Sequence, residues 1–422
     1  MTVDLTIKNC KLWFDKKLID FGLAIDEGII KLISKDANLP DSDEKIDCKG
    51  GIVLPGLIDT HVHFREPGME WKEDWSTGSK AAAKGGITFV LDMPNTKPPT
   101  TTKGRLEEKK KLAEKSVVNF GLYIGIGEEN LNQIEELAKF AHAFKIYMTE
   151  STGELKLTAY DLLVKAFSIV SKTKRVLCLH AEDQRIIEEY SKKNPNNAYF
   201  RPPEAEIAAI KQAIEITKQT GVKAHICHVT TKGGLDLIRK AKTEKLNITC
   251  ETCPHYLFMT EKDLKEKSAF IKINPPLRSK KDQMALWKGI SDGTIDIIAS
   301  DHAPHTYEEK SQDISNAPSG VPGVETTLQL MLNAVNKRII TLEKLVKLMH
   351  DNPIERFDLV DYGKIETGIT ANLTIIDLKK PWKISRDELL TKCKWSPYEG
   401  WKGKGMPIMT IINGNIAHRS LY

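Results

Sequence analysis

The chain contains 422 residues, of which 41% are hydrophobic, and 62 basic and 57 acidic side chains leave it with a formal net charge of +5. Because a single hydrophobic core stops growing at roughly 250–300 residues, this length predicts one large barrel-type domain with a smaller layer, or two domains. The small net charge argues against nucleic-acid binding, and since no apolar run approaches the ~20 residues that span a bilayer, we expect no membrane segment.

Strand-like runs occur at both ends of the chain. Near the N-terminus lies Leu23–Ile30, and near the C-terminus lie Leu373–Ile376 and Met409–Ile416, all bounded by Gly, Asn and Asp turns. We expect the two ends to pair into one small β-sandwich domain, formed by residues 1–54 together with 366–422.

Between these ends, short β-branched apolar runs alternate with longer charge-rich amphipathic stretches, a pattern typical of βα units around a parallel sheet. The expected strands are Leu57–His63, Thr88–Met93, Val117–Gly125, Ala143–Met148, Val176–Ala181, Lys223–Val229, Ile248–Cys253 and Asp296–Asp301. The expected helices are Asp74–Lys84, Lys103–Lys115, Glu128–His142, Ala159–Lys172, Glu204–Thr220 and Lys232–Lys245. Eight such strands favour an α/β fold of the (β/α)8 TIM-barrel type over residues 55–365, rather than an open doubly wound sheet.

The first expected barrel strand carries His61 and His63. Residues i and i+2 of a strand share a face, so both imidazoles can bind one metal ion, and Arg65 falls on the same side. A metal ion that activates water beside a guanidinium that holds a carboxylate indicates a metallohydrolase for a small anionic substrate. By itself this motif also fits a pair of surface or core histidines.

Further polar residues lie in or at the ends of later strands, and strand ends are where TIM-barrel sites are built. They are Lys145 in the fourth strand, His180 in the fifth, His228 in the sixth and Asp301 in the eighth. Each histidine could be a hydrogen-bonded core residue, and Asp301 could cap the segment that follows. Four imidazoles and a carboxylate at one barrel mouth are harder to explain in that way, because unpaired polar groups are costly to bury. These ligand types suit zinc.

Lys145 stands between Phe144 and Ile146 in an apolar strand. A buried ammonium is costly unless it is paired, so two interpretations are open. Either the side chain reaches out of the barrel mouth, or the amine is deprotonated and has reacted with CO2 to form a carbamate that bridges two metal ions.

The seven cysteines are scattered through apolar strands and predict reduced thiols and a cytoplasmic location. Cys250, Cys253 and His255 have the spacing of half a zinc site, but the sequence contains no second Cys-x-x-Cys pair. Buried strand thiols are therefore the favoured interpretation.

Together these motifs resemble those of the amidohydrolase superfamily and, within it, the cyclic amidohydrolases, with the class I dihydroorotase family as the most similar group. The segments that carry the resemblance are Asp59–Gly68, Met93–Thr96, Phe144–Met148, His180–Glu182, His225–Val229, Lys272–Arg278 and Ser300–His305. The resemblance implies two zinc ions (Zn2+) per chain, bridged by carbamylated Lys145. The implied ligands are His61 and His63 for one ion and His180 and His228 for the other, with Asp301 ligating the first ion and serving as the catalytic proton carrier.

The chemistry implied by the resemblance is the reversible closure of N-carbamoyl-L-aspartate to L-dihydroorotate in pyrimidine synthesis, with a metal-bridging hydroxide as the nucleophile of the hydrolytic direction. The residues implied in substrate binding are His63, Arg65, Asn95, Asn274, His305, Ser319 and Gly320. Among them Arg65, Asn95 and His305 are assigned to the carboxylate, and Asn274 and the backbone near Ser319 and Gly320 to the ring. On sequence alone, Asn95 and Asn274 fit equally well as turn residues. The polar segment 306–318 is long for a βα loop and is expected to fold over the substrate.

Three alternatives remain at this point. A hydantoinase or dihydropyrimidinase shares the metal centre, but its ring substrates lack the carboxylate that Arg65 would bind. An allantoinase resembles this motif with Asn in place of Arg65, and a metal-free scaffold relative would have lost ligands that this chain retains. The expected partner is the small-molecule substrate, with homo-oligomer formation and association with aspartate transcarbamoylase left open, and with no nucleic-acid or membrane partner.

Overall fold

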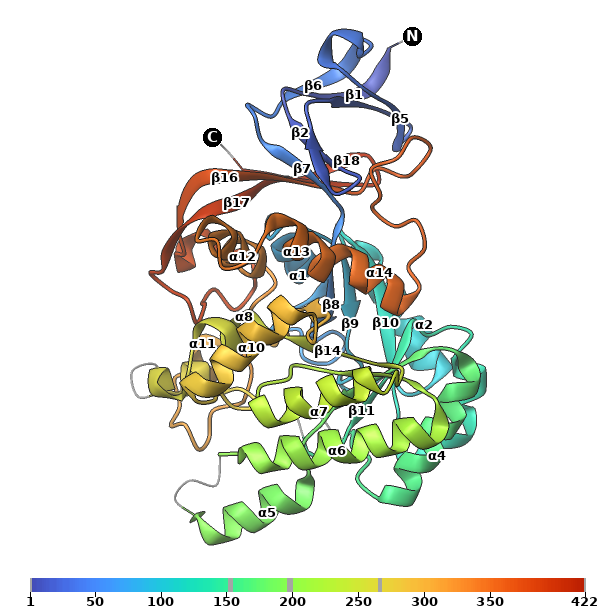
Figure 1. Ribbon diagram of the computed structural model, residues 1–422, viewed down its shortest axis with the longest axis vertical. Coiled ribbons are helices and arrows are strands. Elements are labelled where there is room, and N and C mark those ends of the chain that lie inside the picture. The colour runs from blue at the N-terminus through green and yellow to red at the C-terminus, as the bar shows by residue number, and fades with distance from the viewer. Residues whose placement is uncertain (1, 151–154, 196–199, 265–267, 421–422) are drawn as a thin grey trace.

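The computed structural model describes residues 2–150, 155–195, 200–264 and 268–420. Its strands form an eight-stranded sheet in the middle of the chain, and a four-stranded and a six-stranded sheet from the two ends. In Figure 1 the blue N-terminal strands and the red C-terminal strands lie together above the barrel and its helices. The first residue and the last two residues of the predicted two-ended domain lie outside the described residues.

The eight-stranded sheet is a TIM barrel, as the sequence predicts. Its strands pair in parallel and in chain order: β8 (Leu57–Val62), β9 (Ile87–Asp92), β10 (Asn119–Gly125), β11 (Ala143–Tyr147), β12 (Val176–His180), β13 (Lys223–Ile226), β14 (Ile248–Thr252) and β15 (Ile297–Ile298). The two edges meet through a parallel bridge between Val62 and His302, where His63 N donates to His302 O at 2.8 Å. Asp59 Oδ1 adds to this closure by accepting from Ser300 N at 3.0 Å. The C-terminal ends of the strands therefore share one mouth.

Helices cover the outside of the barrel (Figure 1). The longer helices are α1 (Trp75–Lys84), α2 (Lys103–Leu112), α4 (Tyr160–Thr173), α5 (Gln184–Lys193), α6 (Pro203–Thr220), α7 (Lys232–Thr243), α10 (Lys280–Asp292) and α12 (Thr327–Asn336). The shorter helices are α3 (Ile134–Leu137), α8 (Pro254–Phe258), α11 (Tyr307–Lys310), α13 (Leu342–Val346) and α14 (Asn352–Phe357). Side-chain caps begin several of them, such as Asp74 for α1 and Thr102 for α2, each of which accepts from a backbone N–H of the first turn. In the part of the chain that the structure describes, no helix is both long enough and apolar enough to cross a bilayer.

One expected helix is wrong in its extent. The sequence predicts a single helix over Glu128–His142, but the structure has a 3-10 segment, Glu128–Gln133, followed by the four-residue α3. The Asn130 side chain donates to Thr101 O and to Gly125 O, both at 2.8 Å, and so binds this segment to the barrel. Side chains of this type compete with the helical pattern by bonding to backbone groups elsewhere. Helix α5, in contrast, was not expected from the sequence.

The two ends of the chain form the other two sheets. The four-stranded sheet contains β1 (Val3–Lys8), β4 (Gly22–Asp26), β5 (Ile29–Ser34) and β6 (Ser42–Asp47), and the six-stranded sheet contains β2 (Lys11–Phe14), β3 (Lys17–Ile19), β7 (Ile52–Pro55), β16 (Leu373–Lys383), β17 (Lys402–Ile412) and β18 (Asn415–Arg419). An apolar cluster shared by both sheets includes Leu5, Val53 and Ile411. Because β7 pairs antiparallel with β16, strands from both termini lie side by side. The domain boundaries after residues 54 and 365 remain predictions.

Gly56 connects these terminal sheets to the barrel. Its N donates to Gly363 O at 3.0 Å, and its O accepts from His350 Nδ1 at 2.9 Å. A Cβ at this position would lie 2.6 Å from Thr88 Oγ1 and 2.8 Å from Asn372 O. The close approach of the terminal sheets and the barrel therefore requires glycine.

Candidate active site

The candidate functional residues gather at the C-terminal ends of the barrel strands, the face on which TIM-barrel sites are built. His61 lies in β8, His180 ends β12, and His228 and Asp301 lie just beyond β13 and β15. Arg65, His228 and Asp301 have left-handed backbones, with φ values of 64°, 36° and 45°. That conformation is uncommon for residues with a Cβ, so the surrounding structure must hold these turns in place.

The first histidine pair meets Asp301. His61 Nε2 and His63 Nε2 lie 3.3 Å and 3.2 Å from Asp301 Oδ1. On the other side of each ring, His61 Nδ1 donates to Glu251 Oε1 at 2.5 Å and His63 Nδ1 donates to Asn95 Oδ1 at 2.6 Å. Because carboxylate and amide oxygens accept, these contacts place a proton on Nδ1, so in the neutral form of each ring the Nε2 lone pair faces Asp301.

The second histidine pair has a similar arrangement. His180 Nδ1 lies 3.1 Å from His228 Nε2, and the ring of His228 lies 5.3 Å from that of His61 between centroids. His180 Nε2 donates to Glu182 Oε2 at 2.7 Å, and Arg201 Nη1 donates to the same oxygen at 2.6 Å. The His180 Nδ1 lone pair therefore also faces the centre. Among the described residues, none forms a hydrogen bond with the buried Nδ1 of His228.

These groups form a donor set that fits a metal ion. The ligand atoms of His61, His228 and Asp301 all lie within 4.8 Å of one another. Unprotonated ring nitrogens and a carboxylate oxygen that face each other are suited to a cation between them, and these donors suit zinc. Cys227 and Glu251 form a second such group with His61. Since Glu251 contacts the protonated nitrogen of His61, it fits the role of an oxygen that orients a metal-binding histidine.

Lys145 is fully buried in β11. Its Nζ donates to Cys227 Sγ at 2.9 Å and lies 5.1 Å from the ring centre of Tyr147. Within the described ranges, no carboxylate forms an ion pair with it. This burial does not fit a lysine that reaches out of the barrel mouth, which was one of the two interpretations of its sequence context.

Burial and neighbouring charges determine the protonation of these groups. Burial lowers the pKa of His63 to about 3, and it also lowers the pKa values of His180 and His228. Burial alone would raise the pKa of Asp301, but positive charge on the facing imidazoles, when they are protonated, holds this pKa well below its usual value. The mouth of the barrel thus combines three imidazoles of lowered pKa, those of His63, His180 and His228, with a carboxylate of lowered pKa.

A small cavity of about 30 Å3 opens beside the donor set. Of the residues predicted for the site, those that line it are His61, His63, Arg65, Asn95, His180, His228, Asn274, Asp301, Ser319 and Gly320. Lys145 and His305 do not line it. Most of the predicted metal-binding and substrate-binding residues therefore meet around one small space.

Arg65 contributes a buried guanidinium to this cavity, with 2% of the residue exposed. Its Nε donates to Pro304 O at 3.1 Å, but no carboxylate of the described chain forms an ion pair with it. Burial lowers the pKa of Arg65 to about 10, so the side chain is still charged at neutral pH. A buried cation without an anionic partner is costly, which is the feature expected of a site that receives an anionic ligand.

His305 lies behind Arg65, with 3.2 Å between Arg65 Nη2 and His305 Nε2. Lys72 Nζ can only donate, and its contact with His305 Nδ1 at 2.9 Å places the imidazole proton on Nε2, which donates to Ser319 O at 3.0 Å. Ser319 Oγ in turn lies 3.2 Å from Asn274 when the amide is oriented to suit its neighbours. His305 therefore holds the backbone of the cavity wall.

The segment 306–318 is fixed by a lysine. Lys310 is fully buried, and its Nζ donates to Lys272 O at 3.1 Å, to Pro318 O at 2.9 Å and to Gly320 O at 3.0 Å. Burial lowers the pKa of Lys310 to about 7. This side chain joins the segment to the cavity wall, although the expected movement over a substrate stays a prediction.

Sequence reasoning assigned no role to Glu182, Arg201 or Glu251, which orient the histidines. Glu251 lies between Cys250 and Cys253, whose spacing is the more conspicuous local pattern. Both cysteines are free and buried, as the sequence analysis favours. The available signal was an acidic residue inside an apolar strand, where a carboxylate needs a partner.

The sequence model of the amidohydrolase family matches residues 52–417. The chain is 42% identical to the dihydroorotase of Methanosarcina mazei, with 98% of this chain and 94% of that relative covered. It is 41% identical to the dihydroorotase of Pyrococcus furiosus, with 96% and 91% covered. Among solved structures, the L-hydantoinase (dihydropyrimidinase) of Arthrobacter aurescens matches with a TM-score of 0.94 and 30% identity, over 100% of this chain and 97% of that chain.

Proposed function

This chain belongs to the amidohydrolase family, and we propose that it catalyses the reversible cyclisation of N-carbamoyl-L-aspartate to L-dihydroorotate. It is a hydrolase of cyclic amides, like the relatives it resembles. The observation that selects dihydroorotate among cyclic amides is Arg65, a buried guanidinium in the cavity wall that has no carboxylate partner among the described residues.

Substrate recognition rests on the carboxylate. Arg65 presents a planar fork that can meet a carboxylate through two charge-assisted hydrogen bonds. Dihydroorotate and carbamoyl aspartate carry such a group, whereas hydantoin, dihydrouracil and allantoin do not. We assign Asn95 to the carboxylate, with His305 acting from behind the wall, and Asn274 and the Ser319–Gly320 backbone to the ring.

We propose two zinc ions per chain. His61, His63 and Asp301 would hold one ion, His180 and His228 would hold the other, and a carbamate on Lys145 would join them. The converging unprotonated nitrogens and the cost of an unpaired ammonium at Lys145 support this assignment. When bound, the ions polarise the ring carbonyl and activate the attacking water. Elemental analysis should find about two divalent metal ions per chain; metal-free protein that keeps full turnover in chelator would contradict the assignment.

Asp301 is the proposed proton carrier. Its pKa lies well below the usual value, so it is ionised at neutral pH and can accept a proton from the attacking water. It then delivers that proton to the ring nitrogen that departs, and one carboxylate acts first as base and then as acid. His63 lies beside Asp301 and lines the cavity, which places it in contact with the substrate as well.

The experiment that tests this function compares Arg65→Met with wild type on dihydroorotate, dihydrouracil and hydantoin. A site that buries a guanidinium penalises ligands that leave it unpaired, so wild type should prefer dihydroorotate by roughly 10⁴-fold in kcat/KM. Arg65→Met should lose most of this preference while it keeps its metal content. Arg185→Met, which removes an exposed guanidinium, is the matched control and should behave as wild type. A wild type that prefers an uncharged ring would instead assign the chain to the hydantoinases.

Three further assignments stay predictions. The free, buried cysteines support a cytoplasmic location. Homo-oligomer formation and association with aspartate transcarbamoylase require measurements of mass in solution, first for this protein alone and then for the mixture.

A further inference from the structure

A second cavity lies at the opposite end of the barrel. Its lining includes Val176 and Lys223, the first residues of β12 and β13, and residues near the C-terminal ends of α3, α4 and α14. Its volume is about 410 Å3, and it shares no lining residue with the candidate active site. Because β12 has five residues and a strand rises ~3.3 Å per residue, the two mouths are separated by roughly 17 Å.

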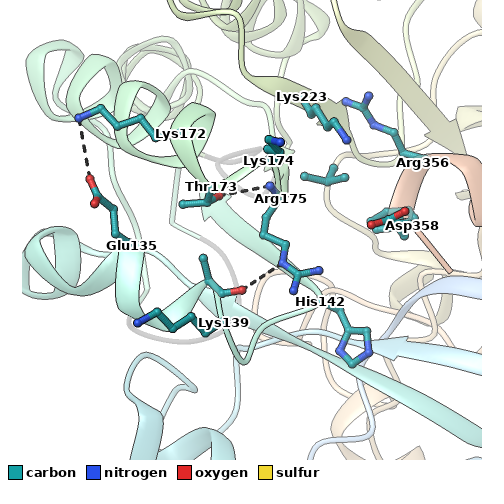
Figure 2. A pocket seen from close by; sticks show the side chains of 13 residues that line it. Glu135, Lys139, His142, Lys172, Thr173, Lys174, Arg175, Lys223, Arg356 and Asp358 are labelled. Atoms are coloured by element: carbon teal, nitrogen blue, oxygen red, sulfur yellow. Dashed lines mark hydrogen bonds and ion pairs between the residues drawn. The ribbon is translucent and has the colours of Figure 1, made fainter. Parts of the chain in front are cut away.

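Cationic side chains dominate this cavity. They are Lys139, Lys172, Lys174, Arg175, Lys223 and Arg356. In Figure 2, Lys139 and Lys172 lie on the left of the view and Lys223 and Arg356 on the right, with Arg175 between them. The carboxylates in the lining are those of Glu135 and Asp358. This excess contrasts with the near balance of the whole chain, whose net charge is only +5.

Few of these cations are neutralised. Lys172 Nζ lies 3.8 Å from a Glu135 oxygen, in a pair that is exposed on both sides. In the described parts of the chain, none of the other cations of the cavity forms an ion pair. The His142 imidazole in the same lining is neutral at pH 7, because burial lowers its pKa to about 4.

Arg356 is the most informative member of the cluster. It is only 9% exposed, and it donates through Nη1 to Asn247 Oδ1 at 2.7 Å and through Nη2 to Ala224 O. Its buried Nε has no hydrogen-bond partner among the described residues. A buried guanidinium held only by neutral oxygens keeps its full charge, and an anion that compensates it would be favoured.

Helix ends explain part of the cluster. Lys172 and Lys174 lie at the C-terminal end of α4, where the helix dipole favours cations, and Arg175 Nε donates to Ala138 O at the end of α3 at 3.0 Å. These partial charges do not neutralise a full positive charge. Neither Lys139 nor Lys223 lies in the last turn of a helix, so the dipole argument leaves their presence at the cavity unexplained.

We propose that this cavity binds a small anion with a di- or triphosphate group, either free or as part of a nucleotide. A phosphate chain spreads several negative charges over a length that cations on both sides of the cavity can meet, whereas one carboxylate would pair with only one or two of them. Arginine and lysine are the side chains that proteins use to hold phosphate oxygens. The site is separate from the catalytic one, so the proposal does not depend on the proposed reaction.

The test is titration calorimetry of the intact protein with sodium triphosphate at about 0.1 M salt, where exposed charges further apart than ~10 Å are largely screened. Lys174→Gln/Lys223→Gln removes two cations that have no ion-pair partner among the described residues. This double variant should weaken triphosphate binding by roughly tenfold or more, because a hydrogen bond to a charged group contributes about 1.5–3 kcal/mol. The control Lys11→Gln/Lys17→Gln removes the same charge from β2 and β3 and should bind as wild type. Arg65→Met should also bind triphosphate as wild type, which separates this site from the catalytic cavity.

Titrations with other compounds identify the class of ligand. Nucleoside triphosphates that bind more tightly than sodium triphosphate would show that the base or ribose is also contacted, and equal affinity would assign recognition to the phosphate chain alone. The proposal is overturned if no phosphate compound binds saturably, if both double variants bind equally well, or if Arg65→Met abolishes binding. A preference for an acidic peptide over triphosphate would overturn it in favour of a protein partner.

Discussion

The two mouths of the barrel are both polar, but they compensate their charges in different ways. At the C-terminal mouth, Asp301 lies against His61 and His63, and each of these rings is held from behind by an oxygen. At the N-terminal mouth, the described residues include a single weak ion pair, between Lys172 and Glu135, and the remaining cations face a cavity.

This difference suits the C-terminal mouth to catalysis and the N-terminal mouth to the binding of an anion. Buried groups that orient one another are already in place when a substrate arrives, and such preorganisation is what stabilises a transition state. Cations around an open cavity keep their charge for a ligand, and salt screens them. Substitutions among the histidines and carboxylates of the C-terminal mouth should therefore change turnover or metal content, whereas those at the N-terminal mouth should change anion binding alone.

The largest effect is expected for Asp301→Asn. The amide cannot carry the proton, so kcat for dihydroorotate should fall by roughly 10²–10⁴-fold, the usual contribution of a general acid–base. Steady-state kinetics measures the loss, and circular dichroism checks the fold. The control Asp313→Asn changes an exposed carboxylate in the segment 306–318. An Asp301→Asn rate close to that of wild type would remove this residue from the mechanism.

Lys145→Ala tests the proposed carbamate bridge. Lys139→Ala is its control, because it removes the same type of side chain at the N-terminal mouth. If Lys145 carries the bridging carbamate, its loss should remove at least one metal ion and most turnover, and short carboxylic acids should partly restore both by occupying the bridge. Elemental analysis and activity assays measure these outcomes. Lys139→Ala should keep metal and rate. Wild-type metal content in Lys145→Ala would show that the lysine is not a bridge.

Glu251→Gln tests orientation without removing a metal ligand. The amide is a weaker acceptor for His61 Nδ1–H, and loss of such orienting oxygens typically costs about 10–100-fold in metal affinity or activity. Competition with a chelator measures the affinity. Glu135→Gln, at the N-terminal mouth, should leave it unchanged. If the two variants hold metal equally well, Glu251 has only a packing role.

The smallest effect is expected for Lys310→Met, which removes a buried lysine of the C-terminal mouth and should change the pH dependence of stability. The pKa of Lys310 is about 7 in the folded chain against 10.5 normally. At pH values between 7 and 10.5, the unfolded chain binds more protons at Lys310 than the folded chain does. The free energy of unfolding of wild type therefore rises with pH, by at most about 1.4 kcal/mol per pH unit, whereas Lys310→Met lacks this contribution. Urea unfolding should therefore show a larger cost of Lys310→Met at about pH 9 than at about pH 6. An equal or smaller cost at the higher pH would contradict the lowered pKa.

The sequence by itself determined the barrel and most of its mouth. Short β-branched apolar runs, separated by amphipathic stretches, are local patterns, and the confirmed βα order follows from them. Since parallel strands of a barrel end at one face, strand-end residues such as His61, His180 and Asp301 could be expected to meet from their positions along the chain alone.

Only the tertiary structure decided which residues orient these histidines and which side chains line the N-terminal mouth. Glu251 lies 190 positions from His61, and no local pattern joins a carboxylate in one strand to a histidine in another. The Asn130 side chain donates hydrogen bonds to the backbone of neighbouring segments, where the sequence predicts the interior of a helix. Helix propensity alone does not predict such long-range contacts. The cationic cavity is assembled from helix ends and strand starts between residues 135 and 358. Such contacts depend on barrel closure, because side chains distant in sequence meet only when the strands have been placed side by side.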